Sequence, residues 1–164
     1  MLIGESFQGD GANAAHINVV LGRRDGPVGT AWATALATPS AGHAPFVAVA
    51  QPGVPALPPT LFVNKAAIGG AHHAQLTWGA AQAGVAQGVG LALEQKVIDP
   101  DDVDELVLIV AVWVNPEADR EDAVFTNNAA ATLEALRNAR DRKPQLAEFM
   151  AAARAPFNPF FRRA

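Results

Sequence analysis

The chain has 164 residues, of which 50% are hydrophobic and 17% charged, a composition typical of one folded domain and not of a disordered segment. It contains no cysteine, which excludes disulfides, thiolate metal sites and cysteine nucleophiles. The formal net charge of -4 argues against nucleic acid as the main partner, because binding to phosphate needs a basic surface. We therefore expect a single domain over residues 1–164.

The sequence carries no signal for a membrane. The N-terminus has neither the basic segment nor the long apolar core of a signal peptide. No run of about 18 apolar residues is present, so no transmembrane helix is expected. These features predict a cytoplasmic protein.

The first half of the chain is predicted to hold four strands and one helix. These are strands 2–7, 15–21, 45–50 and 60–67, and helix 28–37. Strand alternation places His16 and Asn18 on one face of strand 15–21, and likewise Lys65 on one face of strand 60–67. The proline-rich residues 51–59 are predicted to form a stiff loop.

The second half is predicted to contribute two strands and three helices. These are strands 73–77 and 106–114, and helices 79–95, 120–140 and 144–153. The continuous apolar sequence LVLIVAVWV at 106–114 is typical of a central strand buried on both faces. Strands and helices that mix in this order indicate a two-layer α/β sandwich.

The C-terminal segment 154–164 is aromatic and rich in proline, which is unfavourable in water. We expect it to dock on a neighbouring subunit, with an ordered contact inside the same chain as the alternative. Its basic end, Arg162-Arg163, is more simply explained as a solvated terminus than as a binding patch.

Three side chains are candidates for chemistry, and each also has a simpler structural explanation. His16 suits general acid–base catalysis near neutral pH, although a lone strand histidine is more often structural. Lys65 could bind a carbonyl or carboxylate, or could simply extend to solvent. Gln82 offers an amide donor and acceptor for a heterocycle edge, but carries little weight alone.

Other polar residues are weaker candidates. His72 and His73 are adjacent, so on a strand they would point to opposite faces, and no metal site is expected there. His43 follows Gly42 in a loop and could line the mouth of a site. Neither a dinucleotide fingerprint, a phosphate-binding loop nor a nucleophile elbow is present.

Five segments together resemble the formaldehyde-activating enzyme family, the tetrahydromethanopterin hydro-lyases. They are GESFQGDGANAAHIN, ATPSAGHAPFVAV, TLFVNKAAI, WGAAQAGVAQGV and LVLIVAVWVN, in the family's order and nearly end to end. The joint pattern of GDG, four residues, HI, then NK and a distant glutamine is specific, whereas any one segment would be weak.

The resemblance implies a fold and a reaction. It implies a two-layer sandwich like domain 2 of ribosomal protein S5, assembled as a homopentamer with the pterin between subunits. It implies a carbon–oxygen lyase that condenses formaldehyde with tetrahydromethanopterin, using no metal or other cofactor. His16 is then the implied acid, and the implied pterin contacts are Asn18, Val47, Lys65, Ala67 and Gln82.

Two positions depart from the family's pattern. Asn18 stands where the family has an aspartate, and Ala67 where it has a hydroxyl residue. These changes favour an altered pterin preference, and they support a non-catalytic paralogue that binds a pterin or a formaldehyde adduct as the alternative. A structural oligomer or a nucleic-acid binder is a third class, which the acidic composition disfavours.

Overall fold

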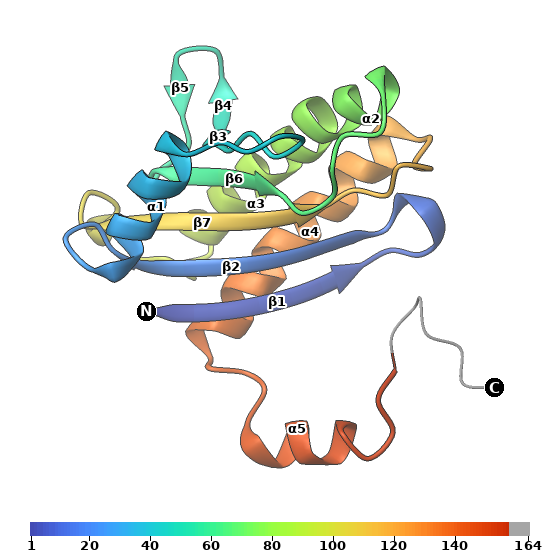
Figure 1. Ribbon diagram of the computed structural model, residues 1–164. Coiled ribbons are helices and arrows are strands. Elements are labelled where there is room, and N and C mark those ends of the chain that lie inside the picture. The colour runs from blue at the N-terminus through green and yellow to red at the C-terminus, as the bar shows by residue number, and fades with distance from the viewer. Residues whose placement is uncertain (158–164) are drawn as a thin grey trace.

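The computed structural model describes residues 1–157 as a two-layer α/β sandwich (Figure 1). The sheet has the strand order β1-β2-β7-β6-β3. Its strands are β1 (Leu2–Gln8), β2 (Ala15–Arg23), β3 (Phe46–Val47), β6 (Thr60–Asn64) and β7 (Leu106–Trp113). β6 and β7 are parallel, and the other neighbouring strands are antiparallel.

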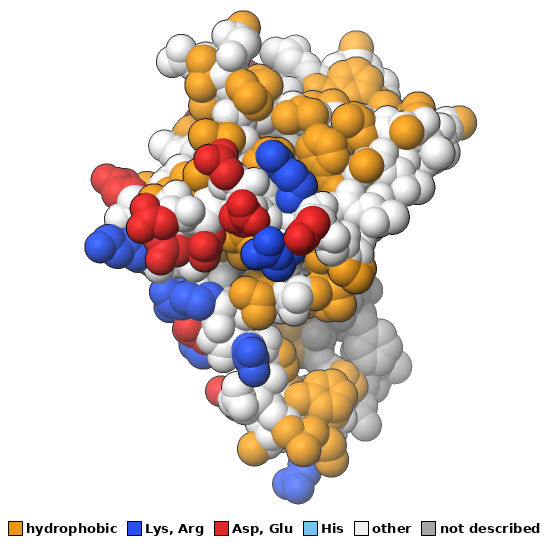
Figure 2. Space-filling model, turned by 90° about the vertical axis from the view of Figure 1, so that its left-hand side faces the viewer, with side chains coloured by type: hydrophobic (Ala, Val, Ile, Leu, Met, Phe, Trp, Pro, Cys, Tyr) orange, Lys and Arg blue, Asp and Glu red, His pale blue; other side chains and the backbone are white. Residues whose placement is uncertain are grey.

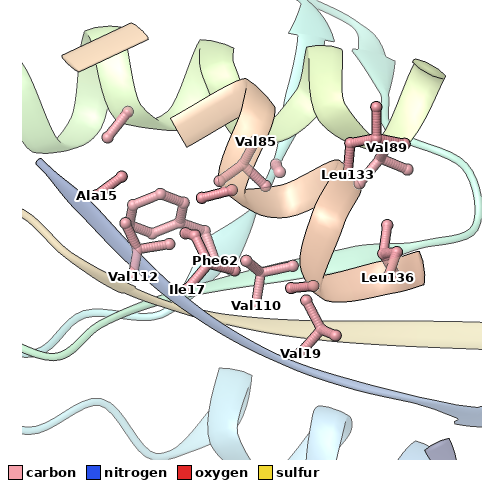
Figure 3. Close-up of a cluster of buried hydrophobic side chains, with 14 of the residues drawn as sticks. Ala15, Ile17, Val19, Phe62, Val85, Val89, Val110, Val112, Leu133 and Leu136 are labelled. Carbon is pink, nitrogen blue, oxygen red and sulfur yellow. The ribbon is translucent and has the colours of Figure 1, made fainter. Parts of the chain in front are cut away.

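Two long helices, α3 (Gln82–Glu94) and α4 (Glu121–Arg140), cover one face of the sheet (Figure 1). The core lies between the two layers. In Figure 3, Ile17 and Val110 of the sheet point toward Val85 of α3, and Leu133 and Leu136 of α4 complete the cluster. Full burial of each such side chain stabilises the fold by about 1.5–3 kcal/mol.

The opposite, outer face of the sheet is covered at one end by α1 (Pro27–Ala37). Gly22 shares the outer face with His16 and Asn18, and a Cβ built on it would lie 2.6 Å from Val28 of α1. At the other end of β2 the outer-face side chains are only half-buried. The uncovered half of this face is therefore where polar side chains can meet a ligand.

The close packing of α3 on α4 depends on two glycines. A Cβ on Gly84 would lie 2.4 Å from the carbonyl oxygen of Phe125, and one on Gly88 would lie 2.6 Å from that of Ala129. Both distances are shorter than real Cβ contacts. The backbones of the two helices therefore approach closely only because these positions have no side chain.

Most of the predicted elements are confirmed, but strand 73–77 is wrong. Residues Ala71–Gln75 form the short helix α2, and Leu76–Ala81 continue as a π-helical turn into α3. His73, Leu76 and Ala80 are buried with the spacing of one helix face. That periodicity, which the local Gly69-Gly70 turn signal obscured, places the segment in the helical layer.

Three strand predictions need smaller corrections. Segment 45–50 is divided between β3 and β4 (Val49–Gln51), and the expected loop 51–59 contains β5 (Val54–Pro55), which pairs with β4. Strand 60–67 ends at Asn64, because the Asn64 amide donates to the carbonyls of Gly42 and Ala66 and fixes an irregular backbone there. β7 is the central strand as predicted, but only its helix-facing side is fully buried, since Ile109 and Ala111 on the outer face are half-buried.

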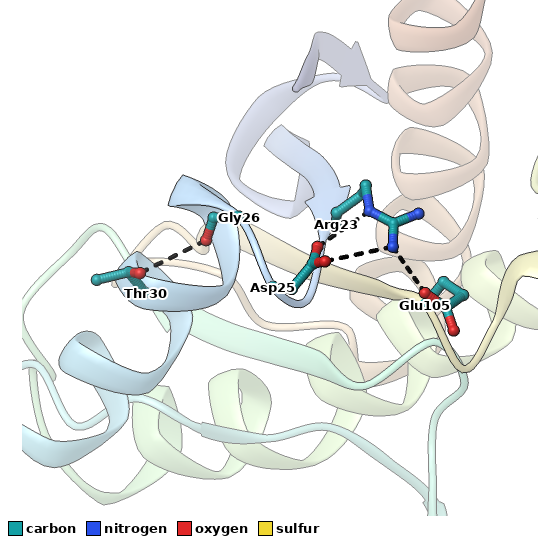
Figure 4. Close-up of polar contacts among 5 residues, drawn as sticks. All are labelled: Arg23, Asp25, Gly26, Thr30 and Glu105. Carbon is teal, nitrogen blue, oxygen red and sulfur yellow. Dashed lines mark hydrogen bonds and ion pairs between the residues drawn. The ribbon is translucent and has the colours of Figure 1, made fainter.

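The end of the β2–β7 pair opposite His16 carries an exposed ion network (Figure 4). Arg23 bonds to Asp25 at 3.0 Å and to Glu105 at 2.8 Å. The guanidinium holds the pKa of Asp25 below its ordinary value through a hydrogen bond and its charge. Such exposed pairs contribute little to stability, and this one tethers a turn at the end of β2 that is remote from His16.

The last helix, α5 (Leu146–Ala152), extends away from the body of the protein (Figure 1). Its side chains Leu146, Phe149 and Met150 are 76%, 55% and 53% exposed, and hydrophobic side chains gather at the lower end of Figure 2. The predicted docking segment 154–164 lies largely outside the described residues. Within residues 1–157, no helix is long and apolar enough to cross a membrane.

Candidate active site

Three of the predicted site residues, His16, Asn18 and Lys65, meet on the uncovered half of the outer face. The Lys65 ammonium donates to Asn18 Oδ1 at 2.8 Å. The same Nζ lies 3.3 Å from His16 Nδ1. The side chains come from β2 and from the residue just after β6, with β7 between these strands.

The sheet itself sets this arrangement. His16 and Asn18 are two residues apart on β2, so both project from the same face. The Lys65 backbone N–H donates to the carbonyl of Val112 at 2.7 Å, which extends the β6–β7 pairing by one residue. The side chain of Lys65 then crosses β7 to reach Asn18, whose register partner on β7 is the small Ala111.

A carboxylate that the sequence did not single out completes the cluster. Glu5 on β1 places Oε1 3.0 Å from His16 Nε2. Phe7, the register partner of His16, has its ring 6.2 Å from the imidazole. The β1–β2 register, which pairs Phe7 with His16 and Glu5 with Asn18, brings both side chains to the face of His16; the connection 9–14 gives no local signal for that register.

The charges around His16 favour a neutral imidazole. Burial and, secondarily, the Lys65 charge lower the pKa of His16, while Glu5 opposes the change. A neutral ring then accepts from Lys65 at Nδ1 and donates its Nε2–H to Glu5, which satisfies both contacts. His16 is thus held in one tautomer between a cation and an anion.

The pKa of Lys65 is lowered as well. Burial lowers the pKa of Lys65 to about 8, and the Glu5 charge opposes the change. Asn18 accepts a hydrogen bond from Lys65 but carries no charge that would stabilise the ammonium. Lys65 and His16 are therefore two contacting basic groups whose pKa values are both lowered, an arrangement typical of sites that transfer protons.

The other predicted contacts lie apart from this trio. Val47 faces the outer side of β3 as the partner of Leu61, and Ala67 lies in an exposed loop against Gly42. Gln82 is buried at the start of α3, where its amide accepts from the Val49 N–H at 3.1 Å and donates to the Val49 carbonyl at 3.0 Å. Their roles toward a pterin stay predictions.

The remaining histidines have structural partners. His43 Nδ1 lies 2.8 Å from the carbonyl of Asn64, which ties its loop to the end of β6. His73 lies on α2 and not on a strand; it is buried and bridges the Gly69 N–H and the Val114 carbonyl. No group of three or more metal-ligating side chains occurs among residues 1–157.

The fold and this cluster define a small α/β protein that carries a carboxylate, an imidazole and an amine in contact on an uncovered sheet face. The model of the formaldehyde-activating enzyme (Fae) family matches residues 3–161. The chain therefore belongs to the formaldehyde-activating enzyme family, which confirms the resemblance drawn from the motifs.

Several similar proteins are bifunctional Fae/Hps enzymes of archaea. That of Archaeoglobus fulgidus is 35% identical over 161 residues, which cover 98% of this chain and 41% of the relative. That of Methanosphaera stadtmanae is 38% identical over 149 residues, 91% of this chain and 37% of the relative. That of Methanothrix thermoacetophila is 38% identical over 145 residues, 88% of this chain and 37% of the relative. The chain thus spans about two fifths of the length of these relatives.

Proposed function

We propose that this protein condenses formaldehyde with a reduced pterin, tetrahydromethanopterin or a close relative, to give the methylene-bridged pterin and water. Family membership supports the formaldehyde chemistry. The observation that carries the proposal is the pairing of His16 with Lys65 on an uncovered sheet face, with Glu5 holding the other side of the ring.

The reaction needs an acid at one step. A pterin nitrogen adds to formaldehyde to give a carbinolamine, whose hydroxyl leaves poorly unless it is protonated. A positioned histidine donating that proton accelerates such a step by about 10²–10⁴-fold. His16 suits this role because its lowered pKa makes the imidazolium, once formed, a ready donor.

Lys65 supplies the proton that His16 delivers. Its ammonium points at Nδ1 across 3.3 Å, so a proton can pass from amine to ring. Glu5 is 56% exposed at its side chain, so a substrate can displace it from Nε2 and receive the proton there. The second pterin nitrogen then closes on the iminium, and positioning of both reactants accounts for the remaining acceleration.

The pterin contacts of Asn18, Val47, Lys65, Ala67 and Gln82 are part of this proposal. Gln82 belongs to the helical layer, whereas His16 lies on the opposite face of the sheet. A pterin beside His16 would therefore reach a Gln82 only in a neighbouring subunit. This arrangement fits the proposed homopentamer with an S5-like subunit, which light scattering would test through the mass in solution.

The decisive experiment is the rate of methylene-pterin formation above the spontaneous reaction. Tetrahydromethanopterin and tetrahydrofolate should be compared, because Asn18 and Ala67 alter the polar groups offered to the pterin. His16→Ala should lose about 10²-fold or more of the protein-dependent rate. A wild-type rate equal to the spontaneous one would instead favour the non-catalytic binding protein.

We further propose that the protein works in the cytoplasm without metal or another cofactor. Turnover that is unchanged after dialysis against a chelator would support the metal-free mechanism. Loss of turnover that added metal restores would refute it.

A further inference from the structure

Lys65 stands out as an amine whose hydrogen-bond partners are neutral. Nζ contacts the amide oxygen of Asn18 and the imidazole Nδ1 of His16. The carboxylate in the network, Glu5, is bonded to the far side of the His16 ring. The ammonium form of Lys65 therefore lacks the direct anionic partner that would hold its proton.

The neutral amine form of Lys65 is accordingly populated near neutral pH. With a pKa of about 8, roughly a tenth of the Lys65 side chains are unprotonated at pH 7. An ordinary exposed lysine has a free amine fraction smaller by on the order of a few hundredfold. Burial sets this balance and the Glu5 charge opposes it, and the titratable groups that face Lys65 are His16 on β2 and Glu5 on β1.

We propose that Lys65 condenses with formaldehyde itself, forming a covalent iminium from which the carbon passes to the pterin nitrogen. This inference rests on the proposed function and gives Lys65 a nucleophilic role in it. It makes the protein a carrier that can capture formaldehyde before the pterin arrives.

The chemistry balances without an oxidant or a reductant. The Nζ lone pair forms a C–N bond to formaldehyde, and a proton passes from this nitrogen to the former carbonyl oxygen to give a carbinolamine. A proton from the His16 imidazolium then lets the C–O bond break, water leaves, and the nitrogen lone pair forms the C=N bond. The pterin amine adds to this carbon and loses its own proton, Nζ takes up a proton, and the C–Nζ bond breaks to release the carbon as a pterin iminium.

The geometry of the site fits each of these reaction steps. A hydroxyl on a carbon attached to Nζ stays within reach of His16 Nδ1, since the two nitrogens are 3.3 Å apart. The hydrogen bond to Asn18 Oδ1 orients the amine without competing for the new carbon. An aspartate at position 18 would instead stabilise the ammonium and suppress its attack.

The test is reductive trapping with formaldehyde and cyanoborohydride, without a pterin, followed by peptide mapping. The three lysines of the chain make the assay internally controlled, because Lys96 and Lys143 are exposed. Methylation of Lys65 at pH 7 should be at least about tenfold faster than at either control lysine. Its rate should reach half its maximum near pH 8, and the preference should vanish in denaturant.

Three variants separate this inference from the proposed function. His16→Gln should slow trapping at Lys65 and leave Lys96 and Lys143 unchanged, and Asn18→Asp should slow it as well. Lys65→Arg should abolish both the trapping and most of the pterin turnover. Trapping of Lys65 no faster than of Lys96 and Lys143, with Lys65→Arg still turning over the pterin, would overturn the covalent step and leave the proposed function intact. Selective trapping without any pterin turnover would instead refute the proposed function and support the covalent capture.

Discussion

At the scale of single residues, the contact with Glu5 most directly controls the pKa and the tautomer of His16, the proposed acid. Glu5 raises the pKa of His16 against the larger effect of burial. Its carboxylate also accepts the Nε2–H and so selects the tautomer that faces Lys65. Glu5 is therefore a positioning residue, which fixes the ring orientation and the tautomer of His16 in the free protein.

Glu5→Gln should therefore lower the pKa of His16 further and reduce turnover at pH 7. A charge-assisted hydrogen bond contributes about 1.5 kcal/mol at its weak end, which corresponds to about a tenfold loss. The alkaline limb of the pH–rate profile, where the His16 acid loses its proton, should move to lower pH, and an NMR titration of His16 should show the same direction. Glu117→Gln, an exposed change far along the chain, is the control; equal effects of the two variants would contradict this role for Glu5.

Lys65 should make stability depend on alkaline pH. Its folded-state pKa of about 8 is below the unfolded value, so between these values the unfolded chain binds more protons than the folded one. The free energy of unfolding should therefore rise as the pH increases from about 8 toward 10. Lys65→Met should remove this rise, whereas the exposed Lys96→Met should keep it, as measured by urea unfolding across that range.

The positions of the site residues on the sheet could be predicted from the sequence, but their contacts with one another could not. His16, Asn18 and Lys65 could be placed on sheet faces because alternation needs only local information. That they touch depends on β7, contributed from residues 106–113, lying between β2 and β6. Glu5 was missed because a carboxylate on an exposed strand is uninformative until the hairpin register is fixed.

At the scale of elements, long apolar strands and helices were predictable, whereas short or context-dependent ones were not. The alternation of β2 and the apolar run of β7 signal their strands unambiguously. Segment 73–77 is too short for a strong periodic signal, and its helix becomes evident only with the burial of His73, Leu76 and Ala80 on one face. β4 and β5 are too short for any periodicity to be read.

The α3–α4 contact offers a matched pair of substitutions in one helix. Gly88→Ala should destabilise the protein by about 1–3 kcal/mol, because the new methyl would meet Ala129 and Thr132 at 2.6 and 2.7 Å. Gly90→Ala should be stabilising by about 0.5–1 kcal/mol, since nothing lies within 4 Å of its Cβ and alanine favours helix. If urea unfolding showed that both substitutions change the free energy of unfolding in the same direction, close packing at Gly88 would be disproved.

At the scale of the whole molecule, α5 is the feature that the isolated chain leaves unexplained. A groove of about 400 Å³ separates it from β1 and α4, with Glu5, Asn138 and Phe149 among its lining residues. The exposed apolar side chains of α5, which are Leu146, Phe149 and Met150, exceed what a surface helix of a monomer normally presents. The proposed assembly would cover them against a second copy.

Phe149→Glu should accordingly shift the protein toward smaller species in light scattering, because a charge would be buried in the subunit contact. Ala153→Glu adds the same charge to an exposed position at the end of α5 and should leave the mass unchanged. An unaltered mass for both variants would exclude α5 from the assembly contact.

The small side chain of Ala111 has a consequence for how this site can change over time. β2 and β6 flank β7 at two strand spacings, about 9.6 Å, and Lys65 must bridge that width to reach Asn18. It crosses beside Ala111, which stands among larger apolar residues in β7. A valine there would suit the strand equally well and yet obstruct the lysine. Divergence within the family can therefore disconnect the amine from its partners by a substitution that touches no polar residue.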